Sequence, residues 1–257
     1  MSFSEDCCSM PAVSSDYKPV GRTFKIDDLE VYETQDTTSN KVLICAYDIF
    51  GVHPNIQQVA DILAKAGYRI VVPDFLRGHN FTYLVRQVIR NFIQTHGNWN
   101  KSVKADILKV LKYYQEQQNI QTFGIFGFCW GARIAIDVSR EIPDVKAAAI
   151  IHPSMFKTDD ANGVKIPMLL VPSKGETDMI PFYEILKKNL VYSELRISRD
   201  AKMNEPGIGI TGLARVVRLH EHYISTPLFL QSRSSLFLLS SNLSLNKKKP
   251  DIISLKR

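Results

Sequence analysis

The hydrophobic pattern between residues 29 and about 199 alternates short apolar runs with amphipathic stretches. The apolar runs predict buried strands at 41–47, 68–72, 122–128, 147–151 and 168–171. Apolar residues at helical spacing predict helices over 56–66, 82–94 and 101–117, with a further helix after residue 131 and a loop over 96–100. Strands that alternate with helices in this way are typical of βαβ units. The sequence therefore predicts an α/β fold with a doubly wound, mostly parallel sheet.

This alternation stops near residue 200 and divides the chain. We expect an N-terminal extension over 1–28, one catalytic domain over 29–200, and a divergent tail over 201–257 that is rich in Ser, Leu and basic residues. The formal net charge of +6 comes from the tail: residues 1–200 hold 23 Lys+Arg and 23 Asp+Glu, whereas 201–257 hold nine and three. A neutral body without a basic, aromatic stripe argues against nucleic-acid binding.

Targeting and metal signals are not visible. The first residues lack a basic region followed by an apolar stretch, and no apolar run has membrane-spanning length. We expect a soluble, cytoplasmic protein that does not bind membranes. The four cysteines lack metal-ligand spacing with histidine and are too few for a disulfide scaffold. Reduced thiols and no metal are expected, with Cys45 buried in its strand.

The strongest chemical signal is the segment Gly127-Phe128-Cys129-Trp130-Gly131, between a predicted strand and a predicted helix. In a nucleophile elbow the glycines allow close strand–helix packing around a strained turn, and the central side chain projects from the sheet edge. Cysteine there gives a thiol nucleophile, and the helix N-terminus favours its thiolate. The alternative is a turn with an incidental buried cysteine, which the strand–helix context disfavours.

The segment from Gly127 to Ala132 resembles the elbow of the dienelactone hydrolase family, in the α/β-hydrolase superfamily, which uses Cys where most α/β-hydrolases use Ser. Other segments agree in order: 47–51, 66–68, 72–74 and 152–154. The resemblance covers residues 18–199. It implies hydrolysis of a small-molecule lactone or carboxylic ester, with no cofactor.

The resemblance also implies roles for individual residues. Cys129 would be the nucleophile, and the backbone N–H groups of Ile49 and Trp130 would form the oxyanion hole. Asp48 matches a carboxylate near the resting thiol that is commonly Glu in the family.

Asp178 falls where the family places the acid that orients the catalytic histidine, with Glu176 as the second choice. Asp178 also precedes a helix that starts with proline, so it would serve as a helix cap. Arg77 follows the strand over 68–72 and is either a partner for a substrate carboxylate or an exposed arginine.

The expected histidine is missing. The family presents it as His-Gly followed by an aromatic residue, downstream of the acid, and here only His220 and His222 follow Asp178. Either one of these is a shifted base, or the reading frame or splicing changes near Ala201. The second explanation predicts weak or absent hydrolysis. For the upstream histidines His53, His79 and His152, polar satisfaction or exposure is expected instead of catalysis.

Two other function classes remain open. The chain could be a non-catalytic member of the fold that binds a small carboxylated ligand or a protein partner. It could also be a cysteine-dependent thioesterase or acyl transferase. A monomer and a homodimer are equally compatible with the sequence.

Overall fold

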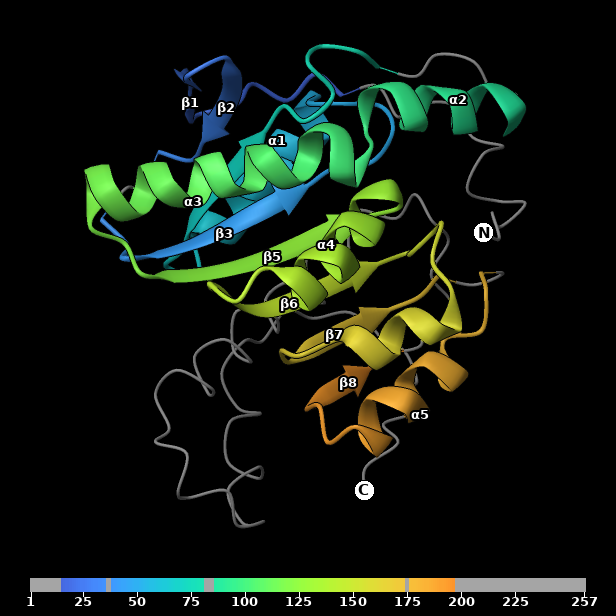
Figure 1. Cartoon of the computed structure of the whole chain (residues 1–257). Coiled ribbons are helices and arrows are strands. Elements are labelled where there is room, and N and C mark those ends of the chain that lie inside the picture. Colours follow the sequence, from blue (N-terminus) through green and yellow to red (C-terminus); the bar gives the residue numbers. More distant parts are fainter. Residues whose placement is uncertain (1–14, 36–37, 81–85, 174–175, 197–257) are drawn as a thin grey trace, which may run out of the picture.

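The protein is described by a computed structural model over residues 15–35, 38–80, 86–173 and 176–196. Its strands form one sheet in the order β1-β2-β4-β3-β5-β6-β7-β8 (Figure 1). The strands are β1 (Arg22–Ile26), β2 (Leu29–Glu33), β3 (Lys41–Ala46), β4 (Arg69–Pro73), β5 (Thr122–Phe128), β6 (Val145–Ile151), β7 (Met168–Val171) and β8 (Ser193–Leu195). The helices are α1 (Pro54–Ala64), α2 (Arg86–His96), α3 (Lys104–Gln118), α4 (Trp130–Glu141) and α5 (Ile180–Lys188), with a π-helical turn η2 (Trp99–Val103) and a 3-10 helix η3 (Thr158–Gly163).

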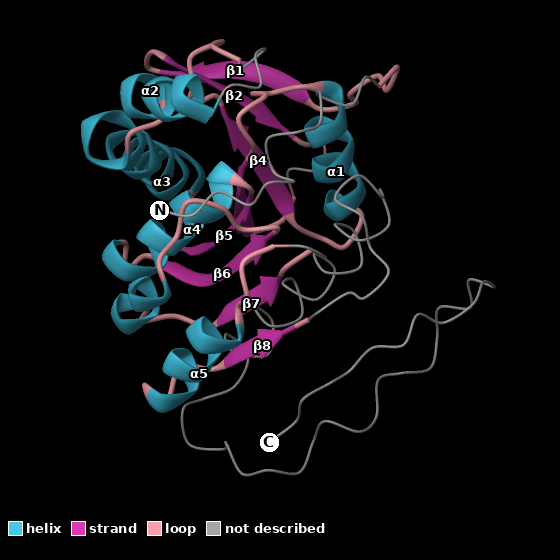
Figure 2. Cartoon of the chain, turned by 90° about the vertical axis from the view of Figure 1, so that its right-hand side faces the viewer, coloured by secondary structure: helices cyan, strands magenta, loops and turns pink. Residues whose placement is uncertain are grey.

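The sheet is parallel from β4 to β8, and the pairs β1/β2 and β2/β4 are antiparallel. Figure 2 shows α1 on one face of the sheet and α3, α4 and α5 on the other. Helices on both faces explain why the central strands read as continuous apolar runs. The predicted doubly wound, mostly parallel α/β sheet is confirmed.

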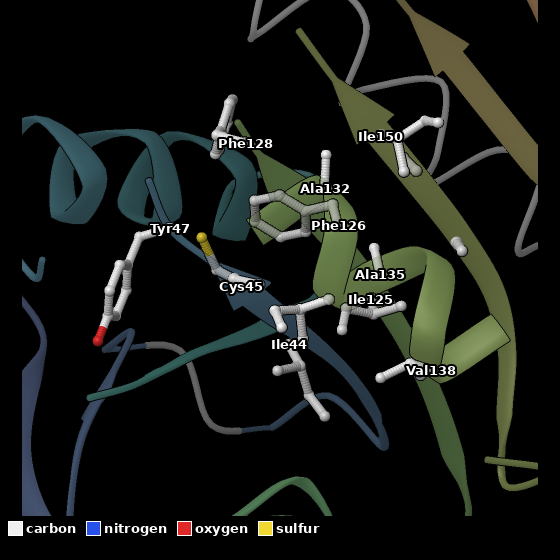
Figure 3. Close-up of a cluster of buried hydrophobic side chains, with 14 of the residues drawn as sticks. Ile44, Cys45, Tyr47, Ile125, Phe126, Phe128, Ala132, Ala135, Val138 and Ile150 are labelled. Carbon is white, nitrogen blue, oxygen red and sulfur yellow. The ribbon is translucent and has the colours of Figure 1, made fainter. Parts of the chain in front are cut away.

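The core lies between the central strands and α4. Figure 3 shows Ala132, Ala135 and Val138 of α4 facing the apolar side chains of β3 and β5. Cys45, in β3, is fully buried as predicted. Each fully buried Leu or Ile contributes about 1.5–3 kcal/mol, so this packing fixes α4 against the sheet.

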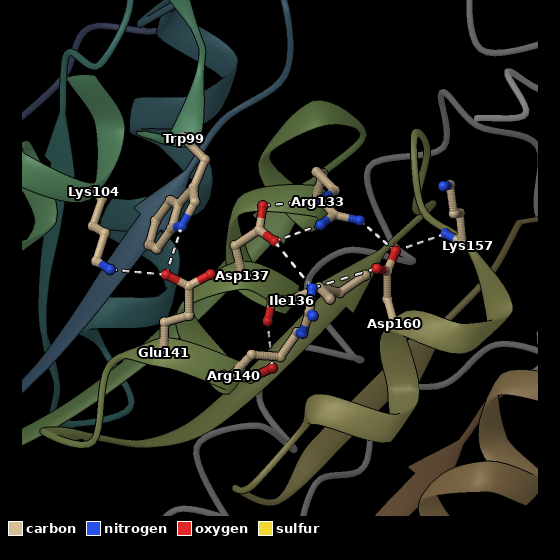
Figure 4. A network of polar contacts seen from close by, with 10 residues as sticks. Trp99, Lys104, Arg133, Ile136, Asp137, Arg140, Glu141, Lys157 and Asp160 are labelled. Atoms are coloured by element: carbon tan, nitrogen blue, oxygen red, sulfur yellow. Dashed lines mark hydrogen bonds and ion pairs between the residues drawn. The ribbon is translucent and has the colours of Figure 1, made fainter. Parts of the chain in front are cut away.

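Polar contacts hold the outer side of α4 (Figure 4). Arg133 forms ion pairs with Asp137 in the same helix and with Asp160 of η3. Burial raises the pKa of Asp137, opposed by its hydrogen bonds with Arg133. Near the other end of the helix, Glu141 accepts hydrogen bonds from the Trp99 indole (3.0 Å) and the Lys104 ammonium (2.9 Å). The helix that starts at the elbow is therefore held at both ends.

The structure differs from the sequence expectation at the ends of the sheet. Residues 22–26, assigned to the N-terminal extension, form the edge strand β1. Strand β8 has only three residues, too few for a periodic pattern to predict. The expected loop over 96–100 contains the start of η2, which is capped where the Asn98 side chain accepts the Lys101 N–H at 3.1 Å.

The sequence also made predictions about the C-terminal tail and about membrane-spanning segments. The predicted tail over 201–257, with His220 and His222, lies outside the described residues. None of the helices within the described ranges is both long and apolar enough to cross a bilayer.

Candidate active site

The turn between β5 and α4 has a strained backbone. Cys129 has φ 52° and ψ −110°, a combination that residues with a side chain rarely adopt. A Cβ added at Gly127 would lie 2.0 Å from the Gly131 carbonyl oxygen, and one at Gly131 would lie 2.0 Å from the Ala46 oxygen. Only glycine allows this approach, so the strained turn and its glycine requirement are as the sequence predicts.

Four neighbouring strands bring their carboxyl ends to this turn. In the sheet order β3-β5-β6-β7, the following loops carry Asp48, Cys129, His152 and Glu176 respectively. Adjacent strands are about 4.8 Å apart, so these side chains share one edge of the sheet. This is the edge where open α/β sheets bind ligands.

The thiol of Cys129 is nearly buried, because the residue is only 5% exposed. Its Sγ lies 3.3 Å from the hydroxyl of Ser154. The backbone of residues 151–154 wraps around it: the Cys129 N–H donates to the Ile151 oxygen at 3.2 Å, and the Ser154 N–H donates to the Cys129 oxygen at 3.3 Å. His152 lies in the chain between Ile151 and Ser154, so these hydrogen bonds bring its backbone close to the elbow.

His152 faces a buried carboxylate. Its Nδ1 lies 3.9 Å from Oε1 of Glu176, whose side chain is 2% exposed. The second oxygen of Glu176 accepts the N–H of Ser173 at 2.8 Å. Burial lowers the pKa of His152, while the charge of Asp48 opposes that shift. The sequence analysis expected polar satisfaction or exposure for His152 and did not pair it with Glu176.

Asp48 and Ile49 occupy the tight turn after β3. Oδ1 of Asp48 accepts the Phe50 N–H at 2.9 Å and lies 3.7 Å from Nε2 of His53. Across the site, Trp130 is the first residue of α4. The first N–H groups of a helix have no acceptor within that helix. The N–H groups expected to form the oxyanion hole thus come from the two segments that Gly131 brings into contact.

Asp178, the first choice for the acid, is exposed. Its Oδ1 accepts the Ile180 N–H at 2.9 Å, at the start of α5. The side chain therefore binds the N–H of the first residue of α5, although Met179 occupies the N-cap position. The buried acid that faces a histidine is Glu176.

Arg77 is engaged by carboxylates of the protein. Its guanidinium donates to both oxygens of Asp106, at 2.8 and 2.9 Å, and to Asp28 at 3.0 Å. A cavity of about 240 Å³ is lined in part by Gly78 and His79, which follow Arg77 in the chain. Its described lining includes Glu30 and Asp74 but no Lys or Arg. This arrangement favours a structural role for Arg77 over contact with a substrate carboxylate.

Comparison with known protein families gives a match that spans the chain from β2 to α5. The model of the dienelactone hydrolase family matches residues 29–189, more than half of the chain. The chain belongs to the dienelactone hydrolase family. This confirms the resemblance inferred from the elbow and the segments that agree with it in order.

Individual relatives are distant. A mouse carboxymethylenebutenolidase homolog is 28% identical over 177 residues, 66% of this chain and 70% of the relative. A maize endo-1,3;1,4-beta-D-glucanase is 30% identical over 154 residues, 60% of this chain and 48% of the maize protein. The structure of a dienelactone hydrolase from Anabaena variabilis superposes with a TM-score of 0.55 at 17% identity, over 81% of this chain and 97% of that one.

Within this family member, replacing Arg77 with methionine tests its structural role. The change removes the bidentate partner of Asp106, which is 2% exposed, and should lower the free energy of unfolding by about 1–3 kcal/mol. Lys187→Met is the control, because its exposed ion pair with Glu184 is worth at most about 1 kcal/mol. Urea unfolding measures both. A raised KM for a carboxylated ester in the Arg77 variant, with unchanged stability, would instead support substrate contact.

Proposed function

We propose that this member of the dienelactone hydrolase family hydrolyses a small carboxylic ester or lactone, with Cys129 as the nucleophile. The observation that carries the proposal is the strained backbone of Cys129 at the carboxyl edge of the sheet. Strain of this kind costs about 1–3 kcal/mol and persists mainly where function requires it. That cost argues against the reading of Cys129 as an incidental core residue, and against a non-catalytic fold.

The reaction follows the two steps of covalent catalysis. The Cys129 thiol gives its proton to a base as its sulfur attacks the ester carbonyl, and the N–H groups of Ile49 and Trp130 bind the oxyanion that forms. Collapse of the tetrahedral intermediate breaks the carbon–oxygen bond, releases the alcohol and leaves a thioester on Cys129. Water then attacks the thioester, which releases the acid and restores the thiol.

The substrate class rests on chemistry and on relatives. The mouse relative is named as a carboxymethylenebutenolidase homolog, and butenolides are lactones. A thioesterase or an acyl transferase would pass through the same acyl-enzyme and differ only in the leaving group or the acceptor. Supplying thioesters, or amine and alcohol acceptors, in the same assay separates these activities from ester hydrolysis.

Hydrolysis of p-nitrophenyl acetate by the full chain tests the proposal. Cys129→Ala should lower kcat/KM by at least about 100-fold, because the covalent step is lost. Cys45→Ala is the matched control, since Cys45 is also a buried cysteine but lies within β3. Equal rates for the wild type and Cys129→Ala would refute the nucleophile. The wild-type rate also tests the predicted weak hydrolysis.

A further inference from the structure

We propose that His152 is the base that accepts the thiol proton of Cys129, and that Glu176 is the carboxylate that orients it. This inference rests on the proposed function and supplies the group that the family pattern lacks in the described part of the chain. It assigns the base to the loop after β6. The sequence offered only His220 and His222, in the tail after β8.

The first support is the placement of His152 by the main chain. The Cys129 N–H donates to the Ile151 oxygen, and the Ser154 N–H donates to the Cys129 oxygen. Ile151 and Ser154 lie on either side of His152 in the chain. His152 itself is fixed because its N–H donates to the Val171 oxygen at 2.9 Å, and its φ is 37°. A positive φ at a residue with a large side chain is uncommon and accompanies functional constraint.

The second support is the orientation of the ring. Nδ1 is the nitrogen that faces the Glu176 carboxylate, at 3.9 Å. In a Cys-His-acid arrangement, the acid faces one ring nitrogen and the other exchanges a proton with the nucleophile. Nε2 of His152 is then the nitrogen available for the thiol. Catalytic hydrogen bonds are often long without substrate and shorten in the reacting complex.

The third support is the charge around the ring. Two carboxylates act on the ring of His152: Asp48 from the loop after β3 and Glu176 from the loop after β7. Burial lowers the pKa of His152 below its ordinary value of 6.5, so the imidazole is neutral at pH 7 and can accept a proton. Both carboxylates stabilise the imidazolium once the proton has moved.

The proton steps balance. The thiol proton moves to Nε2 of His152 as Sγ bonds to the carbonyl carbon, and the imidazolium returns it to the departing alkoxide as the carbon–oxygen bond breaks. In the second step the imidazole takes a proton from the attacking water. That proton returns to the sulfur when the carbon–sulfur bond breaks. The net reaction consumes one ester and one water and yields one acid and one alcohol.

His53 is the competing histidine in the described chain. It lies 3.7 Å from Asp48, at the start of α1. Asp48 already accepts the Phe50 N–H, and both ring nitrogens of His53 are buried without a hydrogen-bond partner among the described residues. His152 differs because its neighbours in the chain are hydrogen-bonded to Cys129 and because a nearly buried carboxylate faces its ring.

The activity test compares histidine variants of the full chain on p-nitrophenyl acetate. His152→Asn suits the positive φ, which asparagine tolerates. It should lower kcat by roughly 100-fold or more, whereas His53→Asn and the double variant His220→Asn, His222→Asn should keep the wild-type rate. In the wild type, hydrolysis should persist below pH 6.5 and fall only when His152 becomes protonated; that acid limb should be missing from His152→Asn. Cys129-dependent hydrolysis that survives in His152→Asn overturns the inference and leaves the proposed function standing.

A second readout does not require turnover. The rate at which iodoacetamide alkylates Cys129, followed at pH 7 on the Cys129 peptide by mass spectrometry, should fall at least about 10-fold in His152→Asn, because the thiol loses its proton acceptor. A folded His152→Asn protein, shown by a cooperative melt, that is alkylated at the wild-type rate refutes the assignment. If His152→Asn does not fold, His152→Gln takes its place and the same two outcomes apply.

Discussion

Replacing Gly131 with alanine is expected to destabilise the protein by at least about 3 kcal/mol. The added Cβ would lie 2.0 Å from the Ala46 oxygen and 2.5 Å from the Tyr47 oxygen. Both are backbone atoms, so the clash is relieved only if α4 separates from β3. That movement would also displace the turn that carries Asp48 and Ile49, and hydrolysis should fall together with stability.

Gly67→Ala provides the matched control. Gly67 ends the segment after α1 with φ +88°, and an added Cβ there meets no atom within 4 Å. Its cost is backbone strain alone, about 1–2 kcal/mol. Urea unfolding of both variants gives the comparison. Equal destabilisation of the two variants would show that the stability of the fold does not depend on the close approach of α4 and β3.

The second large effect concerns the acid. Glu176→Gln should lower kcat by roughly 10²–10⁴-fold, because the neutral amide keeps the shape of the side chain but no longer stabilises the imidazolium of His152. Asp178→Asn should leave kcat unchanged, because its side-chain oxygen still accepts the Ile180 N–H at the start of α5. Glu176 is buried and Asp178 is exposed, although only one residue separates them in the sequence. Comparing the two variants therefore tests whether burial beside His152 identifies the acid.

Initial rates with p-nitrophenyl acetate, together with thermal melts of both variants, decide between the two acids. A large loss in Asp178→Asn, with normal activity in Glu176→Gln, would return the acid to the position that the family resemblance first indicated. The acid limb of the pH profile adds a readout that a purely structural role would not change: it should shift in Glu176→Gln and stay in place in Asp178→Asn.

The sequence predicted the central sheet because its strands are apolar on both faces. The predicted runs over 122–128 and 168–171 match β5 and β7 residue for residue. The elbow could be predicted equally well, because Gly127 and Gly131 flank a cysteine at a strand–helix junction. In the structure, no larger residue fits at either position. Family membership followed from the same local features.

The sequence did not predict the pairing of His152 with Glu176. The two residues are 24 positions apart, and only the parallel pairing of β6 with β7 brings the loops after those strands together. Asp178 has the more recognisable local context, but that context is also typical of a helix cap. The edge strand β1 was missed because four of its five residues are exposed or only half-buried, so it has no apolar run, and β8 was missed because its three residues are too few to define a period.

During turnover, Cys129 should carry the acyl group of the substrate. Rapid acid quench of the full chain with p-nitrophenyl acetate, followed by peptide mass spectrometry, should find an acetyl thioester on Cys129 of the wild type and none at position 129 of Cys129→Ala. Hydrolysis that proceeds with no acyl group on Cys129, at quench times shorter than one turnover, would exclude Cys129 as the nucleophile.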